Sequence, residues 1–136
     1  MMRGLIGKKV GMTRVFSDEG KIIPVTILEA GPCMITQVKT KEKDGYDAVQ
    51  VGYGQRKSKH TTKPLQGHFD AAKVSAKKTL AEFDMVPGFD YKPGQAFNVG
   101  LFEEGDYVTV VGRSKGKGFT GVIKRHNFAR QKKTHG

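Results

Sequence analysis

The chain has only one cysteine and no long apolar run. These two features limit the classes of protein to which it can belong. Its single cysteine, Cys33, excludes an internal disulfide, and its apolar setting favours a buried, inert thiol over a nucleophile. No stretch approaches the ~20 apolar residues that a membrane-spanning helix needs. Residues 1–9 contain too few apolar residues for a secretory signal. We therefore expect a soluble protein of a reducing compartment, the cytoplasm, with no membrane partner.

Acidic residues are also scarce, and their distribution is uneven. The chain carries 24 Lys and Arg against 13 Asp and Glu, a formal net charge of +11. Residues 113–136 hold eight basic side chains and no acidic one, and residues 48–69 hold four basic and none acidic. Residues 69–112 hold four basic and seven acidic side chains. Two basic patches beside a mildly acidic middle point to a polyanionic partner, most often nucleic acid.

Glycine distinguishes the two basic patches. In residues 113–136 the cations are accompanied by glycines at 116, 118 and 121, which let the backbone approach a partner closely. Cations placed in this way neutralise phosphates and release their condensed counterions. For residues 56–63, a solvated basic face is the competing interpretation. The sequence therefore favours an RNA-binding role most strongly for the terminal segment.

Short β-forming runs predict a mainly β fold with a small α insertion. Residues 21–29 are apolar on both faces, as in a barrel wall, and Pro24 within them requires an edge strand or a bulge. Residues 17–20 predict the turn before this strand. Residues 34–40 predict a strand with Met34, Thr36 and Val38 on one face, and Asp-Gly at 44–45 predicts a hairpin into residues 46–53. Three such antiparallel strands suggest a small β-barrel.

The middle of the chain changes character. Residues 64–73 predict a short helix with Leu65, Phe69 and Ala72 on its apolar face. Residues 76–83 fit either a helical turn or an extended piece, and 85–95 predict a loop. Residues 107–111 predict a strand, with 119–124 as its candidate partner. We expect barrel portions at 1–55 and 97–124, an insertion at 56–96, and a basic RNA-binding extension at 113–136.

Familiar phosphate- and RNA-binding motifs do not match. A phosphate-binding loop requires glycine where Lys117 stands, and the RNA-recognition-motif strand requires an aromatic residue where Gly121 stands. We therefore interpret Phe119 as a core anchor rather than a base-stacking platform.

Catalytic and metal-binding patterns are also lacking. The four histidines do not stand at metal-ligand spacing with one another or with Cys33. Residues 103–106 carry the tightest group of carboxylates, and their glycine predicts a turn. An enzyme would need a pocket with convergent polar groups and a perturbed titratable residue, and the sequence nominates none. We expect no catalytic residue, no metal, no cofactor and no small-molecule substrate. The histidines are His60, His68, His126 and His135.

Two segments carry a family resemblance. Residues 4–13 read Gly-Leu-Ile-Gly-Lys-Lys-Val-Gly-Met-Thr, and Phe102 is followed at 112–125 by Gly-x-Ser-x-Gly-Lys-Gly-x-x-Gly-x-x-x-Arg. On these residues the whole chain resembles the N-terminal half of the bacterial-type large-subunit ribosomal protein L-three family. The resemblance implies part of a six-stranded translation-protein-type β-barrel with a helical insertion. Family members usually continue past a Thr-His-Gly like that at 134–136.

The resemblance also implies a function without catalysis. A member binds large-subunit rRNA, supports early assembly and helps organise the region near the peptidyl-transferase centre, beside neighbouring large-subunit proteins. The basic extension would become ordered on RNA. A non-ribosomal basic nucleic-acid-binding β-barrel module is the alternative. The candidate RNA-binding residues are Arg113, Ser114, Lys115, Gly116, Lys117, Gly118, Lys124, Arg125, His126, Arg130, Lys132, Lys133, Arg56, Lys57, Lys59, His60, Lys63, Lys8 and Lys9.

Overall fold

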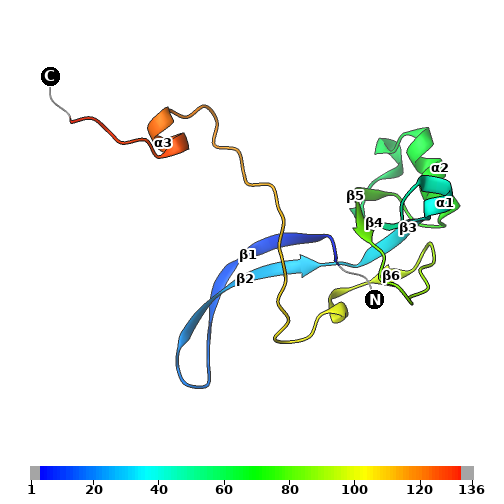
Figure 1. The fold of residues 1–136 in the computed structure, drawn as a ribbon, viewed down its shortest axis with the longest axis horizontal. Helices are drawn as coiled ribbons and strands as arrows, with labels where there is room; N and C mark the ends of the chain where they lie inside the picture. The colour runs from blue at the N-terminus through cyan, green and yellow to red at the C-terminus, as the bar shows by residue number, and fades with distance from the viewer. Residues whose placement is uncertain (1–3, 133–136) are drawn as a thin grey trace. The chain divides into compact units, whose positions relative to one another are not determined.

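A computed structural model describes residues 4–132 of the chain. The chain divides into two compact units, residues 1–105 and 106–136, and each is described by itself. The six strands of the described residues lie in the first unit and form two sheets, whereas the second contains one short helix (Figure 1). The predicted mainly β class with a small helical part is confirmed. Within residues 4–132, no helix is both long enough and apolar enough to cross a membrane.

Strands β1 (Gly7–Phe16) and β2 (Ile22–Ala30) form an antiparallel two-stranded ribbon. The predicted turn between them is confirmed, because the Gly20 amide donates to the Ser17 carbonyl at 2.9 Å and Gly20 has a φ of 76°. Pro24 pairs with Arg14 in this two-stranded sheet, where β2 is an edge strand and tolerates a residue without an amide proton. The register shifts once, between Lys9 and Gly11.

The packing of this ribbon differs from a barrel wall. Eight of its large apolar side chains remain 41–67% exposed. A two-stranded ribbon presents two faces, and the described residues provide no layer that covers these side chains. The apolar pattern therefore predicted the strand correctly but not its burial. The eight residues are Val10, Met12, Val15, Phe16, Ile22, Ile23, Ile27 and Leu28.

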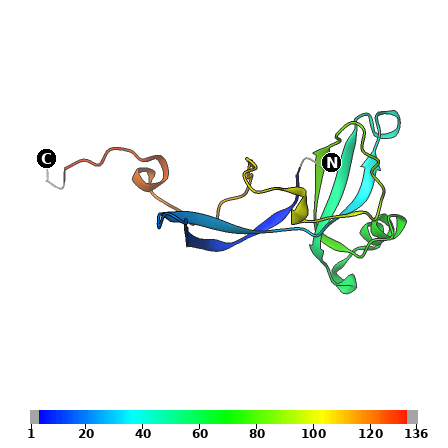
Figure 2. The same ribbon diagram turned by 90° about the horizontal axis from the view of Figure 1, so that it is seen from below.

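The second sheet has four strands in the order β5-β4-β3-β6, all paired antiparallel, and it curls into a half-barrel (Figure 2). Its strands are β3 (Cys33–Lys39), β4 (Ala48–Gln55), β5 (Lys77–Asp84) and β6 (Ala96–Phe97). The predicted hairpin joins β3 to β4, with a short helical turn, α1 (Lys41–Asp44), in the connection. Gly45 ends that turn with a φ of 86°, a conformation that favours glycine.

The core lies on one face of this sheet. It contains Cys33, Ile35, Val49, Val51, Tyr91 and Phe97. The prediction that Met34, Thr36 and Val38 share one face is wrong. Ile35 is fully buried in the core and Met34 is only half-buried. Thr36 is also buried, but its hydroxyl donates to Gln50 Oε1 at 2.9 Å. The register shifts between Ile35 and Gln37, and this irregularity at Thr36 lets both Ile35 and Val38 face the core. The predicted register of Val49 and Val51 is confirmed.

Helix α2 (Lys63–Ala71) confirms the helix predicted for residues 64–73. Pro64 lies in its first turn, where the missing amide proton is tolerated, and Phe69 and Ala72 are buried.

Of the two alternatives for residues 76–83, the extended one is correct, since β5 pairs with β4. The segment 56–96 thus contributes a strand as well as a helix. Residues 85–95 form the predicted loop, and short 3₁₀ turns occur at Ser58–His60 and Val99–Leu101.

The second unit corrects two predictions. Residues 107–111 form no strand, and the predicted partner segment 119–124 instead runs into the first residues of helix α3 (Val122–His126). A strand requires hydrogen-bonding partners along its length, and β-forming side chains alone do not provide them. Gly121 precedes α3, and its carbonyl accepts hydrogen bonds from the amides of Lys124 and Arg125 at 3.1 and 3.0 Å. Asn127 ends α3 with a φ of 56°.

Candidate nucleic-acid interface

The largest group of predicted RNA-binding residues lies in the second unit. Every residue from 106 to 132 except Thr120 is exposed, so the cations from Arg113 to Lys132 all face solvent. Lys133 was also predicted to bind RNA and lies outside the described residues. No Asp or Glu follows Asp106 in the sequence, so residues 107–132 carry basic side chains and no acidic one. The segment is therefore a continuous, accessible source of positive charge. The described members of the group are Arg113, Ser114, Lys115, Gly116, Lys117, Gly118, Lys124, Arg125, His126, Arg130 and Lys132.

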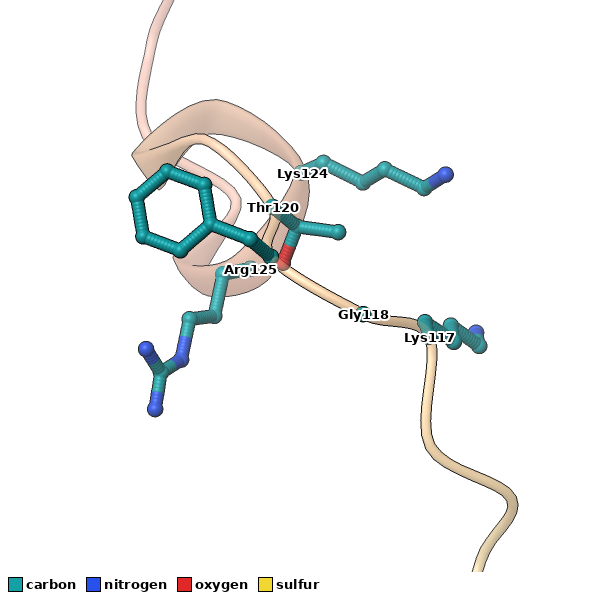
Figure 3. Close-up of a pocket in the computed structure, with 6 residues that line it drawn as sticks. Lys117, Gly118, Thr120, Lys124 and Arg125 are labelled. Atoms are coloured by element: carbon teal, nitrogen blue, oxygen red, sulfur yellow. The ribbon is translucent and has the colours of Figure 1, made fainter.

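Part of this segment folds around a hollow of about 410 Å³. Its lining comes from the stretch before α3 and from α3 itself: Lys117, Gly118, Phe119, Thr120, Lys124 and Arg125. Figure 3 shows Lys117 and Lys124 extending to the same side of the turn, while Arg125 extends to the other. Gly118 has a φ of 69°, a backbone conformation that side chains with a Cβ rarely adopt. The turn thereby brings together cations that are seven or eight residues apart in sequence.

The structure corrects the interpretation of Phe119. Its ring is fully exposed rather than anchored in a core, although it lines the same hollow as the three cations. No side chain is buried among residues 106–132, so these residues offer the ring no core. Phe128 is also exposed, and its ring centroid lies 5.8 Å from that of His126. This unit therefore presents aromatic rings and cations together on its surface.

The second predicted group lies in the first unit, between β4 and α2. Its five side chains are all exposed. Four lie in the connection, which contains no acidic residue, and Lys63 is the first residue of α2. The connection is held at its start by the Arg56 amide, which donates to the Ala76 carbonyl at 2.9 Å. At its end, α2 is held by buried Phe69 and by a 2.7 Å contact between His68 Nε2 and Gln50 Oε1. The group is Arg56, Lys57, Lys59, His60 and Lys63.

The third group, Lys8 and Lys9, lies exposed on β1. Lys8 lines a second hollow, of about 260 Å³, together with Lys78 of β5 and with Gly54 at the end of β4. Sequence analysis missed Lys78, because no local pattern relates it to a residue 70 positions earlier. Only the fold places these two cations beside one hollow.

Groups with catalytic potential do not gather in the described residues. Among residues 4–132, no three His, Cys, Asp or Glu side chains approach closely enough to hold a metal ion. Cys33 is buried as predicted, and its thiol donates to the Ile6 carbonyl at 3.4 Å. Burial raises the pKa of this thiol, which disfavours the reactive thiolate. Residues 103–106 form the predicted turn, with Gly105 at a φ of 92°.

The clearest electrostatic perturbation lies on the outer face of the four-stranded sheet. Lys39 Nζ lies 2.8 Å from Glu82 Oε1 and donates to the Tyr46 hydroxyl at 2.7 Å, and that hydroxyl donates to Glu82 Oε2 at 2.8 Å. Hydrogen bonds from Lys39 and then Tyr46 lower the pKa of Glu82, and the bond to Glu82 raises the pKa of Lys39. The three side chains therefore form hydrogen bonds with one another and join β3, the β3–β4 connection and β5. The arrangement stabilises the sheet rather than forming a reactive site.

Comparison with known proteins bears on the whole chain. The family model described as Ribosomal protein L3 matches residues 84–136. Over 135 residues, the chain is 48% identical to the large ribosomal subunit protein uL3 of Finegoldia magna, covering 99% of this chain and 65% of that protein. It is 50% identical to the large ribosomal subunit protein uL3 of Alkaliphilus metalliredigens, covering 99% of this chain and 64% of that protein. The chain thus spans just under two thirds of the length of these relatives.

Proposed function

This chain belongs to the ribosomal protein L3 family, and from that premise we propose that it is a structural, non-catalytic constituent of the large ribosomal subunit that binds large-subunit rRNA. The resemblance first inferred from residues 4–13 and 102–125 is thereby confirmed. The proposed location is the ribosome in the cytoplasm, beside neighbouring large-subunit proteins. The proposed role extends to early assembly and to organising the region near the peptidyl-transferase centre.

One observation carries the RNA-binding part of this proposal. The exposed segment 106–132 contains seven Lys and Arg side chains and, after Asp106, no carboxylate. Within residues 106–132 no side chain is buried and Asp106 is the only acidic residue, so contacts inside this segment stabilise it little. A phosphate backbone supplies the missing negative charge, and each contact gains free energy from counterion release. RNA binding therefore accounts for both the charge and the exposure of this segment.

The experiment is a salt titration of binding to structured large-subunit rRNA. If half of the eight cations in 113–136 reach phosphates, the plot of log K against log salt has a slope of roughly −3 to −4. Replacing four of them with alanine flattens this slope and weakens binding to all RNA sequences. The substitutions are Lys115→Ala, Lys117→Ala, Lys124→Ala and Arg125→Ala.

A matched variant removes the same charge from elsewhere. Lys21, Lys41, Lys43 and Lys92 are exposed in the first unit, outside the three predicted groups, and are replaced with alanine together. We expect this control to keep most of the slope. Equal flattening in both variants would mean that net charge alone, not the segment, governs binding.

A competition assay addresses the alternative of a general basic nucleic-acid-binding module. Structured large-subunit rRNA and duplex DNA of equal length compete for the chain on a filter. Preference for the rRNA supports the ribosomal role, because the chain then recognises folded RNA rather than charge density alone. Equal competition by duplex DNA would favour the alternative.

A further inference from the structure

The hollow in the second unit combines an exposed aromatic ring with three cations. Phe119 is fully exposed, and Lys117, Lys124 and Arg125 line the same hollow. An exposed phenyl ring leaves a large apolar area in water, and no residue from 106 to 132 buries it. The three cations supply charge but cannot remove this cost. A ligand that covers the ring and also neutralises the cations must carry both a flat apolar face and negative charge.

An unpaired nucleotide has both features, because its base has a stacking face and its phosphate is anionic. We propose that Phe119 is a base-stacking residue, and that Lys117, Lys124 and Arg125 hold the phosphates on either side of the stacked nucleotide. This inference rests on the proposed RNA-binding function and adds its specificity: the hollow selects an unpaired base over duplex RNA.

Geometry supports this division of roles. Lys117 and Lys124 extend to one side of the turn and Arg125 to the other, so cations lie on both sides of the backbone that carries residues 118–120 (Figure 3). A strand of RNA has phosphates before and after each base, which fits cations on two sides. The left-handed conformation of Gly118 sets the turn directly before Phe119. In an A-form duplex every base is already stacked between neighbours, which leaves no face for the ring.

The test uses two RNA hairpins that differ only in a single bulged adenosine, with the full chain and three variants. We expect the wild-type chain to prefer the bulged hairpin. Phe119→Ala loses roughly five- to a hundredfold in affinity for the bulged hairpin and little for the matched one. Its salt slope stays that of the wild type, because no charge has been removed. Because the ring is exposed, this change leaves the fold intact.

A second variant separates stacking from apolar packing. Phe119→Leu keeps apolar volume but removes the aromatic face, so we expect it to bind the bulged hairpin as weakly as Phe119→Ala. Recovery of wild-type affinity with leucine would overturn the proposal, because the ring would then act as a packing group.

A third variant reports contact directly. The chain contains no tryptophan, so Phe119→Trp introduces a single fluorescent reporter at this position. Stacking on the bulged base quenches its emission, and the matched hairpin leaves the emission largely unchanged. Equal emission with both hairpins would refute base stacking at residue 119.

The outcomes keep the two proposals apart. If Phe119→Ala binds both hairpins like the wild type while the four-cation variant still flattens the salt slope, RNA binding stands and base stacking is wrong. If the wild-type chain binds neither hairpin nor structured rRNA, the proposed function fails and this inference fails with it.

Discussion

The four-stranded sheet and the segment 106–132 differ in where their side chains find partners. In the sheet, Ile35, Val49 and Val51 are fully buried, and Lys39 is paired with Glu82 on the outer face. In the segment, no side chain is buried, and aromatic rings stand exposed beside cations. Contacts within the chain therefore stabilise the sheet. The segment has the composition of a surface whose partners are supplied from outside.

The ribbon of β1 and β2 stands between these two cases. Its two strands pair with each other over a long antiparallel register, as neighbouring strands of the sheet do. Its large apolar side chains nevertheless remain substantially exposed, as in the segment. Regular secondary structure and burial are thus separate properties in this chain. The comparison predicts that the two regions respond differently to exchange, core mutation and pH.

Hydrogen exchange gives the largest expected contrast. Strand β4 is a central strand of the sheet and contributes side chains to the buried core. We therefore expect its amides to exchange on the order of a thousandfold more slowly than the amides of residues 107–117. Added large-subunit rRNA should slow the segment, because a partner that binds the ordered state stabilises it. Mass spectrometry of the free and bound chain measures both. Equal protection of the two regions in the free chain would abolish the distinction.

The same substitution in each region gives the next contrast. Ile35→Ala removes a fully buried side chain and should lower the free energy of unfolding by about 2–5 kcal/mol, because it leaves a cavity in the core. Ile123→Ala changes a side chain that is 49% exposed in α3, and its effect should stay within about 0.5 kcal/mol. Chemical denaturation measures both values. A loss from Ile123→Ala as large as that from Ile35→Ala would reveal a hidden core around α3.

The smallest expected effect concerns pH. The folded state lowers the pKa of Glu82, chiefly through Lys39, so its ionised form stabilises the fold above the ordinary carboxyl pKa. That contribution declines as the pH falls from about 4.5 through the lowered pKa. Glu82→Gln should therefore reduce stability slightly at pH 7, and the difference from wild type should vanish in acid. Denaturation at pH 7 and pH 3 measures this difference.

An exposed carboxylate provides the control. Glu104 lies exposed in the turn that precedes the second unit, and Glu104→Gln removes the same charge. We expect it to leave the pH dependence almost unchanged. If it reproduced the Glu82→Gln profile, overall charge rather than the contact with Lys39 would explain the effect.

Local patterns predicted much of the fold. The turn at 17–20, the hairpin around Gly45 and helix α2 followed from residues whose conformational preferences act over a few positions. The inward face of β3 was mispredicted, because one irregularity at Thr36 changes which side chains face the core. The strand expected at 107–111 did not form for a different reason: its residues favour β structure, but no segment among residues 4–132 pairs with them.

The candidate site also contains residues that the sequence predicted and residues that it did not. The basic segment was visible in the sequence, because charge and the absence of carboxylates do not depend on folding. The exposure of Phe119 was not, because an aromatic residue between Gly118 and Thr120 fits both a core and a surface. Lys78 was also missed, since its neighbour Lys8 comes from a distant strand.

The sequence by itself determined the family resemblance of this protein, its charge, its basic segment and the turns and short elements that local preferences control. These properties depend on residue identity and on neighbours a few positions away. The tertiary structure alone decided that Ile35 rather than Met34 enters the core, that the ribbon of β1 and β2 stays exposed, and that Phe119 lies among cations. Burial and pairing depend on which distant residues meet, and that depends on the three-dimensional path of the whole chain.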